Sequence, residues 1–119
     1  DVPGSSSTFL EGIVAYSNAS KTSRLRVQPS LFEQYGAVSE EVARALAEGV
    51  RTNTDAHWGV GITGIAGPGG GSAEKPVGTV HIAVAGPDRT EHLCRTFPFD
   101  RARNREVSAY TALNMIRLF

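Results

Sequence analysis

The sequence predicts a compact α/β domain in which a mixed β-sheet is flanked by helices. Three observations support this class. Strand-like and helix-like hydrophobic patterns alternate along the chain, two late strand patterns flank a turn sequence, and the chain ends in a long helical pattern. The 119 residues have the length of one domain and contain no internal repeat or linker, so we expect a single domain over residues 1–119.

The first half of the chain predicts one strand and two helices. The strand covers Phe9–Ser17, where a short apolar run is bounded by polar clusters, and the polar stretch after it predicts no regular element. A short helix is expected over Pro29–Tyr35, because proline favours the first helical position. The clearest helix is Ser39–Arg51, with Ser39 as its N-cap and two glutamates in its first turn. Its apolar stripe consists of Ala43, Leu46, Ala47 and Val50.

The second half predicts a strand, a glycine-rich loop and a hairpin. Trp58–Ile62 is a short apolar run, and it leads directly into the loop Thr63–Ser72. Val77–Ala85 and Glu91–Phe97 flank a Gly-Pro-Asp-Arg turn of type I and therefore form a hairpin.

The chain ends in an expected helix over Arg101–Leu118, with Asp100 as its N-cap. Four apolar residues are expected to share its core-facing side: Ala109, Ala112, Leu113 and Ile116.

Charge and composition exclude several classes of protein. Twelve Lys and Arg balance twelve Asp and Glu, which argues against nucleic-acid binding, and no apolar run is long enough to span a membrane. The single cysteine, Cys94, cannot form an internal disulfide, so we expect a cytoplasmic protein and interpret Cys94 as a residue that packs in the core or at the sheet edge. His57 precedes a strand, and His81 and His92 lie on the two hairpin arms without a compatible register, so the histidines predict no metal site.

The glycine-rich region has two readings. Gly59–Gly64 spells G-x-G-x-x-G, but the pattern overlaps a strand, and the residues after it cannot begin a long helix, which disfavours a dinucleotide site. The loop Thr63–Ser72 is either a surface connection or a site where backbone N–H groups approach an anion.

Basic residues give two further candidates. Lys21 is either a solvated loop lysine or, close to Tyr16, an amine whose pKa is lowered so that it can activate a hydroxyl group. Arg101, Arg103 and Arg105 crowd the start of the last helix, where they form a solvated face or bind an anion.

Five blocks of residues occur in an order that resembles a known family. These are Asp1–Ser6 (DVPGSS), Val14–Asn18 (VAYSN) with Lys21, Gly36–Glu40 (GAVSE), Thr63–Gly70 (TGIAGPGG) and Glu74–Val80 (EKPVGTV). Together they resemble the C-terminal domain of the bacterial competence/damage-inducible protein CinA, over essentially the whole chain. The resemblance implies hydrolysis of the carboxamide of nicotinamide mononucleotide to nicotinate mononucleotide and ammonia, in pyridine nucleotide salvage. It also implies a homodimer that needs no metal or organic cofactor.

The resemblance also suggests roles for individual residues. Tyr16 and Lys21 would transfer protons, whereas Ser6 and Thr63 would contact the substrate or the oxyanion. With the arginine cluster included, the expected substrate-binding residues are Thr63, Gly64, Ala66, Gly67, Arg101 and Arg105.

Two departures from the family pattern affect these expectations. The family Gly-Asp-Arg reads Phe99-Asp100-Arg101 here. The family also places a Glu-Ser-Cys-Thr-Gly-Gly segment, whose serine is the favoured nucleophile, upstream of the block that begins this chain. We therefore expect an N-terminally incomplete domain whose nucleophile lies outside the 119 residues. Two alternatives remain, a nucleotide-binding or assembly domain without catalysis and a general binder of mononucleotide phosphate.

Overall fold

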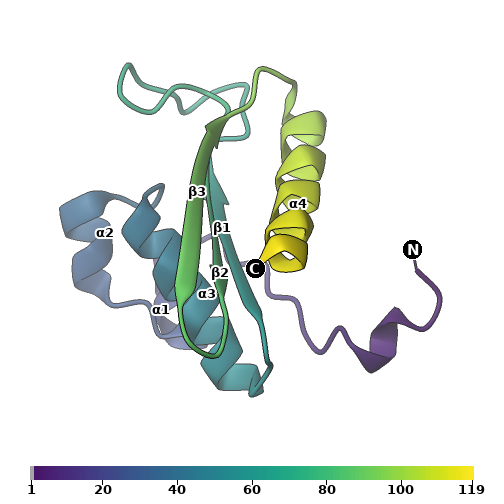
Figure 1. Cartoon of the computed structure of the whole chain (residues 1–119). Helices are drawn as coiled ribbons and strands as arrows, with labels where there is room; N and C mark the ends of the chain where they lie inside the picture. Colours follow the sequence, from purple (N-terminus) through teal and green to yellow (C-terminus); the bar gives the residue numbers. More distant parts are fainter. Residues whose placement is uncertain (1) are drawn as a thin grey trace.

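The computed structural model describes residues 2–119 and contains an antiparallel sheet with helices on both faces (Figure 1). The elements in chain order are the 3-10 turn η1 (Ser5–Ser7), α1 (Asn18–Leu25), α2 (Pro29–Tyr35), α3 (Glu40–Thr54), β1 (Gly59–Gly64), β2 (Thr79–Ala85), β3 (Thr90–Thr96) and α4 (Arg101–Leu118). This confirms the α/β class, the helix at Pro29–Tyr35, the long central helix, the hairpin and the final helix.

The sheet has the order β1-β2-β3, and both pairings are antiparallel. Alternate residues of β2 face opposite layers, as the pleat requires. Ala83 and Ala85 pack on Ala43 and Ala47 of α3, whereas Val80 and Ile82 pack toward Ala112 of α4. Figure 1 shows α3 on one side of the strands and α4 on the other.

Glycines in β1 allow α3 to lie directly against the sheet. A Cβ atom at Gly59 would overlap the carbonyl oxygen of Ala47, and one at Gly61 would overlap that of Ala43. The first two glycines of the G-x-G-x-x-G pattern therefore serve the contact between helix and strand. This use accounts for the pattern without a dinucleotide.

A second apolar cluster joins α1, α2 and α3. Its buried members are Leu25, Val27, Val42 and Leu46, and Phe32 packs against them. Gly49 of α3 contacts the backbone of Leu25 so closely that a Cβ atom there would overlap the Leu25 carbonyl. This cluster fixes α1 and α2 on the outer side of α3.

The strand expected over Phe9–Ser17 is not formed. The segment is extended, with Ile13 and Ala15 packed against the helical cluster while Val14 and Tyr16 remain 77% and 78% exposed. The alternation typical of a strand is therefore present, but within residues 2–119 the segment pairs with no strand of the sheet. For this reason the described sheet is antiparallel rather than mixed.

Two further expectations need correction. The polar stretch after residue 17 forms α1, because the Ser17 Oγ accepts a hydrogen bond from the backbone N–H of Ser20 and so caps a helix. On α4, Leu113 is 62% exposed and Ala109 is also exposed. The buried positions of α4 are the mostly polar set Asn104, Ser108 and Ala112.

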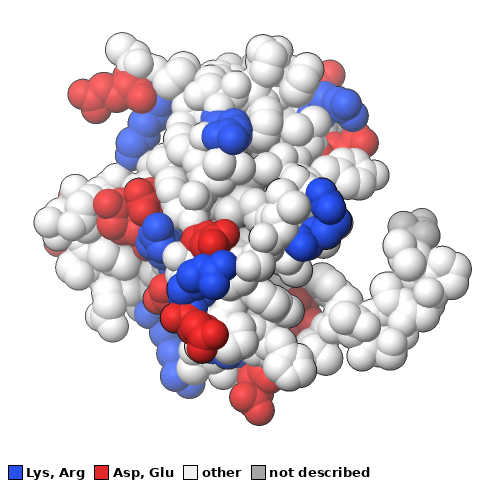
Figure 2. Space-filling view, in the orientation of Figure 1, with Lys and Arg blue, Asp and Glu red and all other residues white. Residues whose placement is uncertain are grey.

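The surface mixes the two signs of charge. On the face shown in Figure 2, Lys and Arg side chains lie among Asp and Glu side chains rather than in a patch of one sign. Among the helices of residues 2–119, none combines the length and the apolar character needed to cross a membrane.

Candidate functional site

Lys21 lies in the first half of α1, on the side that faces α2. Its backbone N–H donates to the Ser17 carbonyl, and its Nζ lies 5.9 Å from the centre of the Phe32 ring. The side chain is half-buried, and this burial lowers the pKa of the Lys21 amine below the ordinary lysine value. A lysine in this setting is a better proton acceptor near neutral pH than a fully solvated one.

The whole connection between β1 and β2, residues 65–78, is called the glycine loop from here on, and it is held at both of its ends. The Ile65 N–H donates to the Thr79 carbonyl, and the Gly78 N–H donates to the Ile65 carbonyl. The Thr63 side chain is buried, and its hydroxyl donates to the Ala37 carbonyl at 2.7 Å. This hydroxyl therefore anchors the loop to the turn before α3.

Helix α4 holds the loop from the other side. Arg101 donates from its Nη1 to the Gly67 carbonyl at 3.3 Å, and Asn104 donates from its Nδ2 to the Ala66 carbonyl at 3.1 Å. Asn104 is 1% exposed and also bonds both backbone polar groups of Phe99. Asn104 was not predicted from the sequence, although one signal was visible: an amide on the side of the final helix that faces the protein core.

Helix α2 connects Lys21 with the glycine loop. Phe32, which lies under the Lys21 amine, is one helical turn from Tyr35, whose carbonyl accepts a hydrogen bond from the Nζ of Lys75 at 3.0 Å. Lys75 belongs to the far limb of the loop. The two lysines thus contact the same short helix, Lys21 at the Phe32 ring and Lys75 at the Tyr35 carbonyl, three residues further along. Lys21 and this limb of the loop lie on the same side of the sheet.

Three other predicted residues are not brought into this contact network. Tyr16 precedes the N-cap of α1 and is 78% exposed. Ser6 belongs to η1, in an exposed arm that Figure 1 shows at the opposite end of the molecule from the glycine loop. Arg105 is exposed on α4. This arm extends away from the rest of the molecule. Its backbone hydrogen bonds join residues close in sequence, and its apolar residues, such as Phe9 at 67% exposure, do not pack on the core.

A hollow of about 330 Å³ lies between the extended segment and α1. It is lined by Glu11, Gly12, Ile13, Val14, Ala15, Ser20 and Arg24. It contains neither Lys21 nor any residue of the glycine loop. We therefore place the candidate site on the contact network around α2 and not in this hollow.

The register expected for the histidines is wrong. His81 of β2 pairs with Cys94 of β3, and His92 pairs with Ala83, which brings the two imidazoles together. The Nδ1 of His81 lies 2.9 Å from the Nε2 of His92, and the rings are stacked. Cys94 is exposed, and its Sγ lies 3.8 Å from the Nε2 of His81, so it is not a core packing residue. Within residues 2–119, no group of three or more His, Cys, Asp or Glu side chains is arranged to hold a metal ion.

We expect the histidine pair to make stability depend on pH. Burial lowers the pKa of both imidazoles in the folded chain. As the pH falls, His81 and His92 therefore become protonated in the unfolded chain before they do in the folded chain. As the pH falls through 6.5, the ordinary value, the free energy of unfolding should fall and should continue to fall until the folded pKa values are passed. The hydrogen bond with Arg44 lowers the pKa of the Glu40 carboxyl below its ordinary value, so this group begins to take up protons in the unfolded chain only at lower pH than the histidines.

Unfolding midpoints of the wild type and of the double variant His81→Gln/His92→Gln at about pH 7.5 and 5.5 test this expectation. On acidification, the unfolding midpoint of the wild type should fall further than that of the variant. Equal losses would show that the imidazoles do not titrate differently in the two states.

The comparisons with known proteins identify the family. The family model of the CinA C-terminal domain matches residues 1–119. The chain belongs to this family. It is 59% identical to a CinA-like protein of Anaeromyxobacter sp. (strain K), over 98% of this CinA C-terminal domain and 29% of the relative. A CinA-like protein of Acidobacterium capsulatum is 54% identical, with 28% of its length covered. The chain therefore spans less than a third of these relatives.

Solved structures support the same assignment. The competence/damage inducible protein CihA from Agrobacterium tumefaciens matches with a TM-score of 0.83 and 39% identity, over 87% of this CinA C-terminal domain and 64% of that chain. A CinA superfamily protein from Escherichia coli matches with a TM-score of 0.81 and 30% identity, over 87% and 61%. The fold described above is thus the fold of this family.

Proposed function

We propose that this domain contributes the catalytic amine and the substrate-holding loop of an amidohydrolase that acts on the carboxamide of nicotinamide mononucleotide. The observation that carries the proposal is the position of Lys21. Its amine is half-buried over Phe32, its pKa is lowered, and α2 links it to the glycine loop. Membership of the CinA family supports the same chemistry through the resemblance of the motifs.

In the proposed reaction, the neutral Lys21 amine accepts a proton from a hydroxyl nucleophile, of a serine or of water. The nucleophile attacks the carboxamide carbon and forms a tetrahedral oxyanion. Collapse of this species breaks the C–N bond, and the proton held by Lys21 leaves with the departing ammonia. If the nucleophile is a serine, water then hydrolyses the acyl intermediate. With either nucleophile, the overall reaction converts amide and water to acid and ammonia.

The loop would supply the groups that stabilise charge. The N–H groups of Ala66 and Gly67 find no acceptor among residues 2–119, whereas the Ile65 N–H is already used by Thr79. Free backbone donors at a strand end suit an oxyanion or a phosphate. Asn104 holds the Ala66 carbonyl, whose peptide carries the Gly67 N–H, and the Gly78 N–H holds the Ile65 carbonyl, whose peptide carries the Ala66 N–H. These two bonds fix the direction of the donors, and Arg101 bonds the next carbonyl, that of Gly67. The exposed Tyr16 phenol, close to Lys21 in sequence, is proposed as a second proton carrier.

Ammonia release from nicotinamide mononucleotide tests the function. The 119-residue chain and the CinA-like protein of Anaeromyxobacter sp. (strain K) are assayed side by side, and the thermal shift caused by the nucleotide is recorded for both. We expect the longer relative to release ammonia and nicotinate mononucleotide in equal amounts. A thermal shift without turnover in both proteins would instead favour a nucleotide-binding domain without catalysis.

Replacement of Arg101 should weaken substrate binding more than turnover. In Arg101→Met the Gly67 carbonyl loses its donor, and a phosphate loses a guanidinium partner. We expect KM for nicotinamide mononucleotide to rise about 10- to 150-fold with a smaller change in kcat, because a lost charge-assisted hydrogen bond costs roughly 1.5–3 kcal/mol. Arg117→Met, near the far end of α4, is the matched control. Equal KM values for Arg101→Met and the control would remove Arg101 from the site.

A further inference from the structure

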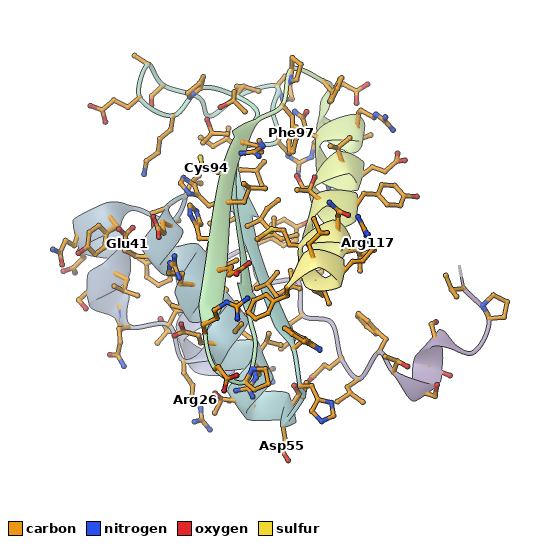
Figure 3. All side chains as sticks on the ribbon, in the orientation of Figure 1. Arg26, Glu41, Asp55, Cys94, Phe97 and Arg117 are labelled. Carbon is orange, nitrogen blue, oxygen red and sulfur yellow. The ribbon has the colours of Figure 1, made fainter. Side chains whose placement is uncertain are left out.

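The antiparallel register of β2 and β3 gathers three reactive side chains on the face that α3 covers, and α3 adds a fourth. His81 and Cys94 are cross-strand partners, and His92 is the diagonal neighbour of His81. Glu40, at the start of α3, places its Oε1 3.6 Å from the Nδ1 of His92. Figure 3 shows Cys94 on β3, on the side of the sheet away from Arg117 and α4.

The protons of this cluster can be placed from one end to the other. The Glu40 carboxylate lies 3.6 Å from the Nδ1 of His92, which is too far for a hydrogen bond, but its negative charge favours the neutral His92 tautomer with the proton on Nδ1 and an acceptor at Nε2. The Nδ1 of His81 must then donate to that Nε2 at 2.9 Å. Neutral His81 is thereby left with an unprotonated Nε2, and this atom faces the Cys94 thiol at 3.8 Å.

The arrangement is that of a nucleophile next to an oriented base. The thiol lies within sulfur hydrogen-bond distance of a base, the base is oriented by a second imidazole, and a carboxylate completes the series. Glu40 is itself held by Arg44, whose Nε donates to its Oε2 at 2.8 Å. The Cys94 side chain is exposed on the edge strand, so a small molecule can reach the sulfur.

We propose that Cys94 is a modification site that exchanges with low-molecular-weight disulfides, with His81 as its general base. The thiol proton passes to the Nε2 of His81 as the sulfur attacks one sulfur of the incoming disulfide. The disulfide bond breaks, a mixed disulfide forms on Cys94, and the leaving thiolate takes the proton from His81. The positive charge that His81 carries in passing is compensated through His92 by Glu40.

The surrounding charges are compatible with a neutral resting base. Burial, His92 and Lys75 lower the pKa of His81, while Glu40 and Glu41 raise it less. Burial and Arg44 also lower the pKa of His92, and they outweigh Glu40 and Glu41, which raise it. Both imidazoles are therefore unprotonated at neutral pH and able to accept the thiol proton.

The test follows the reaction of the chain with dipyridyl disulfide as a function of pH. Cys94 is the single cysteine, so the thiopyridone released reports this thiol alone, and mass spectrometry of the adduct confirms the site. The same chain unfolded in urea gives the profile of an ordinary thiol at each pH. Only the change of the rate with pH is compared, and not its absolute value, since the exposure of the Cys94 thiol differs between the native and the unfolded chain.

We expect the native rate to fall less than about tenfold between pH 8.5 and 6.5, whereas the unfolded chain and native His81→Gln lose about fiftyfold, the behaviour of an unassisted thiol. His92→Gln and Glu40→Gln should show intermediate profiles, and Glu40→Gln also serves if His81→Gln fails to fold. His57→Gln, which changes an exposed histidine away from the cluster, should match the wild type. Parallel profiles for the native and unfolded wild type, or a profile unchanged by both His81→Gln and Glu40→Gln, would overturn the proposal.

Discussion

Replacement of Lys21 by methionine is expected to reduce ammonia release from nicotinamide mononucleotide by about a hundredfold or more, the usual effect of losing a general base. Methionine keeps the apolar part of the side chain over Phe32, so the contact between α1 and α2 is retained. The loss should appear in kcat, because the amine acts on the proton of the nucleophile. Steady-state kinetics of ammonia release check this expectation.

Arg24→Met provides the matched control for Lys21→Met. Arg24 is an exposed basic residue one turn further along α1, and its replacement removes a positive charge while Lys21 remains. We expect unchanged kinetics in this control. The pH profile adds a second readout: the wild-type rate should rise as the pH increases through the Lys21 pKa, which burial places below the ordinary lysine value. A similar rate in Lys21→Met and Arg24→Met would remove Lys21 from the mechanism.

Gly61→Ala is expected to be the most destabilising small substitution in the sheet. A Cβ atom at this position would overlap the Ala43 carbonyl oxygen and would lie 2.6 Å from the Ala47 backbone nitrogen, so α3 has to move away from β1. We expect a loss of about 1–3 kcal/mol of unfolding free energy and a midpoint about 5–15 °C lower. Thermal unfolding followed by circular dichroism measures both quantities.

Gly69→Ala is the control for Gly61→Ala. Gly69 lies in the glycine loop, and an added Cβ atom there would meet no heavy atom within 4 Å. Its midpoint should stay close to that of the wild type. An equally small change in Gly61→Ala would show that α3 does not rest directly on β1, and the explanation of the glycine spacing would then be wrong.

The sequence allowed the elements with strong local signals to be predicted. The Ser39 cap and the apolar stripe of α3, the turn of the hairpin and the Asp100 cap of α4 are local features, and each is found where expected. The failure at Phe9–Ser17 has a different cause, because a strand also needs a neighbour to pair with, and alternation alone does not supply one. Helix α1 was missed although Ser17 is an N-cap residue, since its segment lacks an apolar stripe.

The candidate site was predictable only in part. Lys21 and the glycine loop were found from residue type and motif, but their link through α2 depends on packing between segments distant in the chain. The pairing of His81 with His92 and Cys94 depends on one register of the hairpin, and a shift by one residue would separate them. The core-facing position of the Asn104 amide was visible in the sequence, but its bond to the Ala66 carbonyl depends on the packing of α4 against the loop.

The most direct test of the proposed site is a titration of the isotope-labelled chain with nicotinamide mononucleotide, followed by nuclear magnetic resonance. If the amine of α1 and the loop beyond β1 serve a single ligand, the signals of the Lys21 side chain and of the Ala66 and Gly67 amides will shift together along one saturation curve. A nucleotide that shifts the loop signals and leaves the Lys21 signals unchanged at saturation would contradict the account.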